Sequence, residues 1–412
     1  MSKKTFIIFL ILIYRAFSIA QNKDLDYFLN NAVANSPLLN EYRNNILIAG
    51  VDSALIVAGN KYQIAGNGNA YYAPIVNGWG YDKAITNGQQ LSALVVMNKQ
   101  IYNKRNLSLA FADIQIQKDS LRISSAISEQ DLKKNIIAQY ITVFSDQLQI
   151  SFNNELHNLL QRQDTILKKL TQQNVYRQVD YLSFLVTVQQ QNLTKQQLEI
   201  QHKNDFSLLN YLAGIVDTTP LTLEEPQLKV VRTIIADSSA FFLKYKIDSL
   251  RLINSRALID LGYRPKVSLF ADAGYQSSFD INPYKNFGTN IGINFSIPIY
   301  DGRQRRLQYT KLGIEERTRQ RNRDFFQRQY YQQIAQLQQQ LSLIQNLESS
   351  ISDQIRFLET LIEANSKLLE TGDIKMTDYI LALNNYITAK NLLVQNKVSR
   401  YQIINQLNYW NK

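Results

Sequence analysis

The chain has 412 residues, with 45 lysines and arginines against 34 acidic residues and a formal net charge of +11. It has no cysteine and only two histidines, His157 and His202, far apart in sequence. These counts exclude disulfides, thiolate metal sites and thiol nucleophiles, and we predict no metal and no cofactor. Neither a phosphate-binding glycine loop before a helix nor a glycosidase-like carboxylate pair stands out, so we expect no enzymatic activity.

Residues 1–20 have the pattern of a secretory signal. Lys3 and Lys4 precede a short apolar run, which ends at the small-residue cleavage site Ser18-Ile19-Ala20. The run is shorter than the roughly 20 residues that a membrane-spanning helix needs, and no later stretch reaches that length. We therefore expect an exported chain, with no nucleic-acid partner, whose membrane-spanning parts are strands.

The first half, residues 21–216, is predicted to contain a helix, two strands within about 61–102, and long helices over about 103–214. Glycine gathers between Gly50 and Gly88, whereas residues 103–213 contain neither glycine nor proline. Such an uninterrupted run is typical of very long helices. Residues 217–236, which include two prolines, are predicted to be a linker.

The second half, residues 237–412, repeats this order, with a helix, two strands within about 264–300, and long helices over about 302–410. A helix from Arg303 to Glu370 would be on the order of 100 Å long. Apolar residues recur along it every three or four positions, so we expect the long helices to pack side by side.

Residues 287–299 alternate strictly between apolar and polar or glycine positions. The apolar positions are Phe287, Ile291, Ile293, Phe295, Ile297 and Ile299, with Thr289 among them. This alternation is the pattern of an outer-membrane barrel strand, although a hairpin packed on a helix would look similar. In the first half the pattern is weaker.

Three groups of identical residues recur at one offset of 198 positions. They are Ile101-Tyr102 with Ile299-Tyr300, Asp180-Tyr181 with Asp378-Tyr379, and Leu209-Asn210-Tyr211 with Leu407-Asn408-Tyr409. A shared register indicates duplication of a strand-strand-helix-helix unit. Four strands cannot close a membrane barrel, so we expect the chain to oligomerise.

Several motifs together resemble the TolC-type outer-membrane efflux proteins. They are Pro298-Ile299-Tyr300-Asp301-Gly302-Arg303 after the alternating strand, Tyr263-Arg264-Pro265, the turn from Gly372 to Tyr379, and the closing helix from Asn391 to Asn408. The resemblance implies a homotrimer with a 12-stranded outer-membrane barrel and a long helical barrel in the periplasm. It also implies a tapered tip that opens when a periplasmic adaptor and an inner-membrane pump dock, with no catalysis.

The resemblance places candidate tip and gate residues at Asp378, Asp180, Gly372 and Asn174. Asn174 stands where the family has a glycine, but asparagine tolerates the left-handed backbone of a tight helix end. Leu381 and Ile374 replace other charged gate residues of the family. Helix capping is the alternative role for the two aspartates.

The strand-to-helix junction comprises Pro298, Tyr300, Asp301 and Gly302, with Tyr102 at the corresponding point of the first half. Basic residues lie near both junctions: Arg303, Arg305, Arg306 and Lys311 at the second, and Lys99, Lys104 and Arg105 at the first. These clusters are expected to contact solvent or lipid phosphate, or alternatively to attract anionic solutes.

The sequence thus predicts a passive outer-membrane channel subunit of a three-part efflux or secretion machine. The alternative is an exported coiled-coil structural or adaptor protein of the cell envelope with no pore of its own. Duplicated alternating strands favour the channel, because a scaffold has no need of them.

Overall fold

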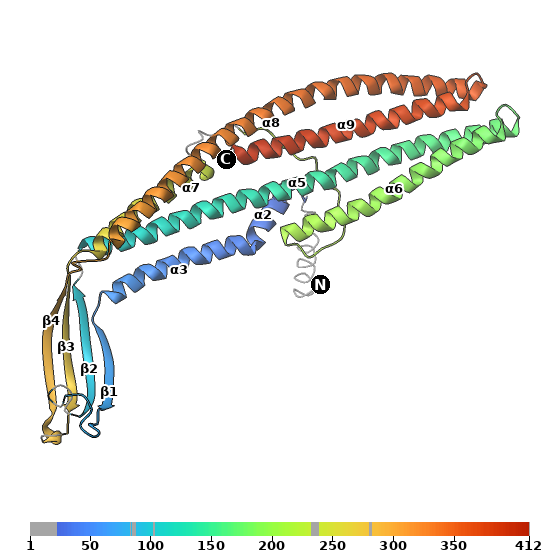
Figure 1. Ribbon diagram of the computed structural model, residues 1–412. Helices are drawn as coiled ribbons and strands as arrows, with labels where there is room; N and C mark the ends of the chain where they lie inside the picture. Colours follow the sequence, from blue (N-terminus) through green and yellow to red (C-terminus); the bar gives the residue numbers. More distant parts are fainter. Residues whose placement is uncertain are drawn as a thin grey trace, which may run out of the picture. The chain divides into compact units, whose positions relative to one another are not determined.

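The computed structural model describes residues 23–82, 84, 88–101, 104–231, 239–279 and 282–411. The predicted signal segment and Tyr102 lie outside these ranges. The described chain is mainly helical, with four antiparallel strands in one sheet (Figure 1), as the predicted fold class requires. None of the helices in these ranges combines the length and hydropathy needed to cross a bilayer.

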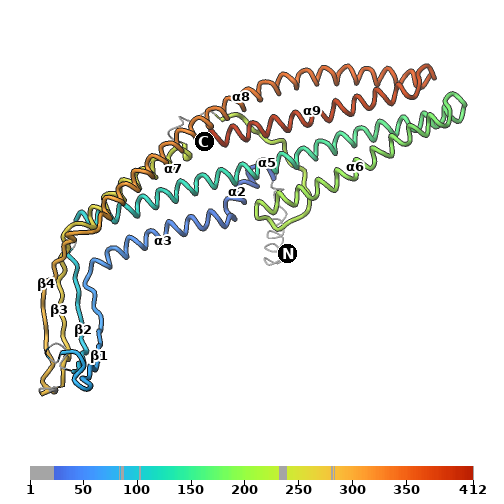
Figure 2. The backbone as a smooth tube through the Cα atoms, in the orientation of Figure 1, coloured from blue at the N-terminus to red at the C-terminus, as the bar shows by residue number. Residues whose placement is uncertain are grey.

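Helices and strands alternate in a repeated order along the chain. The elements are α2 (Leu25–Asn35), α3 (Pro37–Gly59), β1 (Gln63–Tyr72), β2 (Gln89–Ile101), α5 (Lys104–Gln172), α6 (Gln178–Ala213), α7 (Ala240–Gly262), β3 (Lys266–Ser277), the short 3-10 helix η2 (Pro283–Lys285), β4 (Phe287–Ser296), α8 (Gln304–Thr371) and α9 (Met376–Trp410). The two longest helices, α5 and α8, have 69 and 68 residues. Each is followed by a shorter helix that returns beside it (Figure 2).

The sheet has the strand order β1-β2-β3-β4, with every neighbouring pair antiparallel. The register aligns the apolar positions of all four strands on one face: Ile64 lies opposite Met97, Met97 opposite Ala271, and Ala271 opposite Ile291. Most of this face is uncovered, and Ile291 is 85% exposed. We call it the apolar sheet face.

The opposite face carries polar residues on all four strands, interrupted by apolar ones. Asp272 lies opposite Asn290, whereas the same row continues through Val96 to Ala65 on β2 and β1. Apolar residues on both faces of β2 explain why alternation is weaker in the first half of the sequence. Strands β1 and β4 are the edges of the sheet, and each has one side without a strand partner among the described residues.

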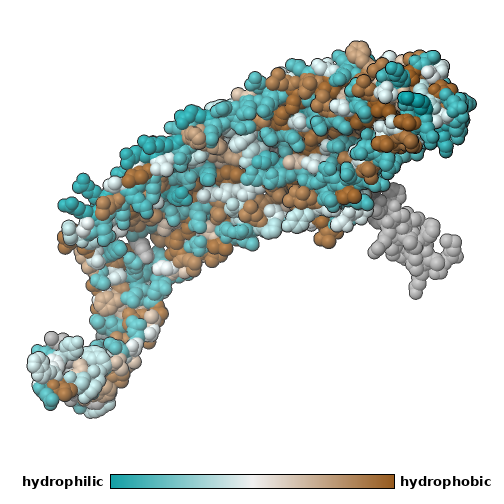
Figure 3. All heavy atoms as spheres, turned by 45° about the vertical axis from the view of Figure 1, so that its right-hand side comes forward, coloured by the Kyte–Doolittle hydropathy of each residue, from teal (hydrophilic) through white to brown (hydrophobic). Residues whose placement is uncertain are grey.

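The chain forms two compact units, each drawn from both halves of the sequence. The first unit contains the described parts of residues 1–40, 126–239 and 326–412, and the second those of 41–125 and 240–325. The compact units therefore do not coincide with the two predicted sequence repeats. On the side seen in Figure 3, hydrophilic residues cover much of the helices, with hydrophobic ones scattered among them.

In the first unit, the segment after α6 is held against the helices. Gln147 of α5 exchanges two hydrogen bonds with the backbone of Leu223, at 2.8 and 3.1 Å. Glu225 forms an ion pair of 2.7 Å with Lys397 of α9, and Asn408 accepts from the N–H of Val231 at 2.7 Å. Hydrogen bonds and an ion pair therefore hold the described part of the predicted linker against α5 and α9.

Candidate functional site

The turns that join the long helices share one backbone design. Asn174, between α5 and α6, and Gly372, between α8 and α9, both adopt left-handed conformations, with φ of 62° and 81°. The next residue in each turn donates its N–H to a carbonyl five residues earlier: Val175 to Leu170 and Asp373 to Leu368, both at 2.9 Å. These bonds satisfy carbonyls at the helix end, and asparagine at position 174 supports the same turn as glycine.

The two turns contact each other within the first unit (Figure 2). The buried Tyr176 hydroxyl lies 3.2 Å from the Leu369 carbonyl and 3.0 Å from the Ile374 carbonyl, to which it donates. A Cβ atom added to Gly372 would lie 2.7 Å from Cγ1 of Val175. The first turn is therefore fastened to the second through Tyr176, and close packing at Gly372 leaves little room between them.

Asp180 and Asp378 lie at the third position of α6 and α9, because the N-cap positions belong to Arg177 and Lys375. Neither aspartate is therefore the N-cap of its helix. The Asp180 carboxylate accepts two hydrogen bonds from the Arg177 guanidinium, at 3.0 and 3.1 Å. These bonds are the main reason that the pKa of Asp180 is lowered, and the Arg177 backbone N–H contributes, as in a capping box.

Asp378 differs from Asp180 in its surroundings. Its side chain is exposed, and no ion pair joins it to Lys375, although both residues are described. The two candidate gate carboxylates thus occupy matching positions, but only Asp180 is bound by a neighbouring cation. Gating by either group stays a prediction.

A shared core lies below the two turns and is built from both helical hairpins. Its buried members are Phe152, Leu156, Leu160, Leu167, Tyr176, Phe184, Ile362, Leu369, Met376, Tyr379, Ala382 and Leu383. The repeat-related residues Tyr181 and Tyr379 are treated differently there. Tyr181 donates to Asp164 at 3.0 Å, whereas Tyr379 is fully buried, its hydroxyl has no partner, and burial raises its pKa. Ile362 stands at the position that corresponds to Asp164, which explains the loss.

The strand-to-helix junction is organised by Asp301. Its carboxylate accepts hydrogen bonds from the N–H groups of Arg303 (2.9 Å) and Arg305 (2.8 Å), which are otherwise unpaired at the start of α8. Gly302 and Arg303 both have left-handed φ angles, of 61° and 70°. Hydrogen bonding from Tyr263 is the largest cause of the lowered pKa of Asp301. Asp301 and Gly302 therefore set the turn from strand to helix.

Of the other predicted junction residues, the two that the structure describes do not join this network. Pro298 and Tyr300 are exposed, and Tyr300 keeps 86% of its surface. In the basic cluster, Arg305 pairs with Asp260 at 2.5 Å and stacks over Tyr263, with its charge centre 5.2 Å from the ring centroid. The Arg305 guanidinium is therefore held by an ion pair and by a ring contact.

One buried acidic group was not anticipated from the sequence. Asp146 of α5 is 1% exposed, accepts from Gln201 of α6 at 3.2 Å, and keeps one oxygen without a partner. Burial, and secondly the neighbouring carboxyl of Asp205, raise the pKa of Asp146 to about 7. His202 lies in the same region with an unpartnered Nδ1, and burial lowers its pKa.

Sequence reasoning also missed Tyr176 and Arg177. The repeat offset could have identified Arg177, because Lys375 lies 198 positions later and is also basic. Each of the two residues comes three positions before a candidate aspartate. Tyr176 had no such signal, because its counterpart is Ile374. In the described parts of the chain, no group of three or more histidine, cysteine or acidic side chains is arranged to hold a metal.

No protein-family model matches the sequence, and no curated protein is similar to it in sequence. Solved structures do match in fold. CusC, whose structures concern transmembrane channel formation, has a TM-score of 0.76 at 12% identity, covering 95% of this chain and 92% of its own. The outer membrane protein VceC of Vibrio cholerae has a TM-score of 0.75 at 12% identity, covering 94% and 96%.

The Campylobacter jejuni outer membrane channel CmeC gives a TM-score of 0.71 at 12% identity, covering 94% of this chain and 85% of its own. Each match extends over nearly the whole chain, strands and helices together. At the level of the fold, the resemblance indicated by the sequence motifs is confirmed.

Proposed function

We propose, from the fold that this chain shares with outer membrane channels, that it is a channel subunit that passively conducts solutes out of the periplasm. The observation that carries the proposal is the apolar sheet face. A continuous apolar surface across four strands, left exposed, is costly in water and favourable against lipid acyl chains. Together with the shared fold, this surface supports localisation in the outer membrane, with the helices extending into the periplasm.

The sheet also requires more than one copy. Unpaired backbone groups at the β1 and β4 edges would be unsatisfied in the hydrocarbon core, where no water replaces the missing strand. Pairing β1 of one copy with β4 of the next removes both edges and closes a ring. Three copies of a four-stranded sheet give a barrel of 12 strands, which is the homotrimer that we propose.

The helical hairpins supply the gate in this proposal. The turns at Asn174 and Gly372 form the periplasmic tip, where an adaptor protein and an inner-membrane pump dock. Asp180 and Asp378 place carboxylates beside these turns, so that three copies would present rings of negative charge. The pump supplies the energy, and this chain carries out no reaction.

Conductance across a planar bilayer tests the proposal. Detergent-extracted mature protein is compared with the double variant Asp180→Ala plus Asp378→Ala, and with the control Glu363→Ala, which removes an exposed acid paired to Lys367 in α8. We expect discrete channels whose conductance or cation preference changes only in the double variant. Unchanged currents would keep the pore and remove the acidic gate. A water-soluble protein without channels would contradict the proposal and favour an envelope scaffold.

A further inference from the structure

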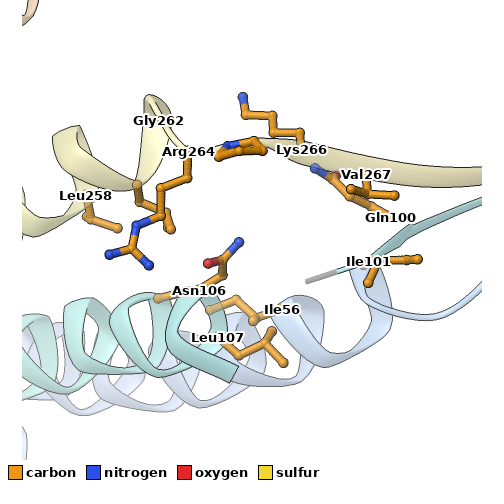
Figure 4. A pocket seen from close by; sticks show the side chains of 14 residues that line it. Ile56, Gln100, Ile101, Asn106, Leu107, Leu258, Gly262, Arg264, Lys266 and Val267 are labelled. Carbon is orange, nitrogen blue, oxygen red and sulfur yellow. The ribbon is translucent and has the colours of Figure 1, made fainter. Parts of the chain in front are cut away.

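A pocket of about 880 Å³ opens in the second unit where four elements begin or end. Its walls come from the end of α3, the end of β2, the start of α5, and the connection from α7 into β3 (Figure 4). This volume lies within the range of sites that bind small molecules. Pro298, Tyr300, Asp301 and Gly302 are not among its lining residues.

Two glycines leave the pocket open. Gly59 ends α3 and Gly262 ends α7, and both line the cavity. A Cβ atom added at either position would meet no atom within 4 Å. Neither residue has a left-handed φ angle, so backbone conformation does not require glycine at these positions. A larger side chain at either position therefore has room at the wall of the cavity.

The lining combines apolar side chains with one cation directed inward. Ile56, Leu107, Leu258 and Val267 form the apolar part. Figure 4 shows the Arg264 side chain extending across the pocket toward the amide of Asn106, whereas Lys266 points away. Arg264 is half-buried and has no ion-pair partner within the described residues. A half-buried guanidinium without a counter-charge favours an anionic ligand that can accept two parallel hydrogen bonds, such as a phosphate or a carboxylate.

We infer that this pocket binds an anionic phospholipid, with the phosphate at Arg264 and Asn106 and an acyl chain against Ile56, Leu107, Leu258 and Val267. The inference rests on the proposed function. Ile101 and Val267, the last paired residues of β2 and β3 on this side, line the pocket, so the cavity begins where the apolar sheet face ends. For a sheet in lipid, that is the level of the phosphate groups.

Charge near the pocket supports a lipid phosphate over a neutral amphiphile. Basic residues gather at the ends of the same elements: Lys61, Lys99, Lys104, Arg105 and Lys266. Such a cluster at the membrane surface attracts anionic headgroups. The apolar lining favours a lipid over a free phosphate ion, because an ion alone would leave Ile56 and Leu258 facing water.

Native mass spectrometry of the detergent-purified oligomer tests this inference with phosphatidylglycerol as the probe, and diacylglycerol and inorganic phosphate as comparisons. We expect saturable binding of phosphatidylglycerol to the wild type. Arg264→Gln should weaken it about tenfold, as loss of one charge-assisted hydrogen bond predicts. Gly262→Leu should abolish it by filling the cavity, and Gly313→Leu, in open space on α8, should leave it unchanged.

Equal phosphatidylglycerol binding by wild type, Arg264→Gln and Gly262→Leu would overturn the inference. So would equal affinity for diacylglycerol, or binding of inorganic phosphate with no preference for the lipid. Absence of any bound lipid from an intact oligomer would overturn it as well. Conductance of the same preparations separates the two proposals: active channels without site-specific lipid binding disprove only this inference, and lipid binding without channels disproves only the channel.

Discussion

A single hydroxyl group fastens the two helix turns together. Tyr176 donates to the backbone carbonyl of Ile374 in the second turn. Ile374 is also its counterpart in the other half of the sequence, and an isoleucine side chain cannot form a reciprocal bond. Only the first turn therefore contributes a side-chain hydrogen bond to this contact, and removing the Tyr176 hydroxyl tests it. For a gate formed by these turns, the strength of this bond sets part of the cost of separating them.

We expect Tyr176→Phe to lower the free energy of unfolding by about 1 kcal/mol, the usual net value of a lost hydrogen bond. It should also raise the open probability of the channel in planar bilayers, because the turns separate more easily. Tyr181→Phe is the matched control, since it loses a hydrogen bond to Asp164 within the first hairpin only. Equal effects of both variants on opening would contradict a special role for Tyr176.

The buried carboxyl of Asp146 predicts an unusual pH dependence. Its folded-state pKa of about 7 lies above the ordinary value, so between roughly pH 4 and 7 the folded chain holds a proton that the unfolded chain has released. This group's contribution to stability therefore falls as pH rises through that window and is constant above it. The loss is on the order of 4 kcal/mol.

Thermal unfolding of wild type and Asp146→Asn at pH 5 and pH 8 measures this contribution. We expect the variant to gain stability relative to wild type at pH 8 more than at pH 5. The quantity to compare is the difference in stability between wild type and variant, because it cancels the contribution of His202. Burial lowers the pKa of His202, so below the ordinary histidine pKa its contribution to stability rises with pH, opposite to that of Asp146. Asp205→Asn should weaken the dependence by removing the neighbouring charge. A pH-independent difference would show that Asp146 ionises normally.

Among the elements, a strand was easier to predict from the sequence when apolar and polar residues alternate strictly along it. Residues 287–296 alternate because one side of β4 is apolar and exposed, and the pattern alone located the strand. In β2, Leu94 and Val96 are apolar on the opposite face, so the period of two is blurred and the repeat had to supply the assignment. Register between strands was not predictable, because it depends on pairing between distant segments.

The helical elements show a similar division. Near-absence of glycine and proline predicted the long helices, and the family resemblance implied the turns at Asn174 and Gly372. The contact between the turns was not predictable, because Tyr176 pairs with residues 193 and 198 positions away and has no repeated partner. The pinned segment after α6 was also missed, since prolines and an absence of periodicity do not show that Gln147 holds Leu223.

A charge on the apolar sheet face should prevent stable insertion. We expect Ile291→Lys to cost about 2–4 kcal/mol if the residue faces the bilayer midplane. Asn290→Lys, one residue away and on the other face, should cost far less. Urea-dependent folding into lipid vesicles, followed by heat-modifiable migration on gels, measures both variants. Equal loss in the two variants would show that neither face is specifically in contact with lipid.

For the whole molecule, stoichiometry is the decisive quantity. Sedimentation of the detergent complex should give the mass of three copies, which is the stoichiometry of the proposed 12-stranded ring. The chain has no native cysteine, so single cysteines placed on β1 and β4 can form disulfides only between the chosen strands. Cross-linking should give dimers and trimers and no larger species. A ladder extending beyond three copies would contradict ring closure.

The uncovered edges of β1 and β4 also limit when the sheet can safely form. A chain exported one copy at a time would carry these edges through an aqueous compartment, where an open strand pairs with any extended segment that it meets. Productive assembly then depends on whether the edge strands pair with other copies of this chain before they pair with unrelated extended segments. The yield of closed oligomer should rise with the local rate of synthesis. It should fall when the sheet forms before other copies are near.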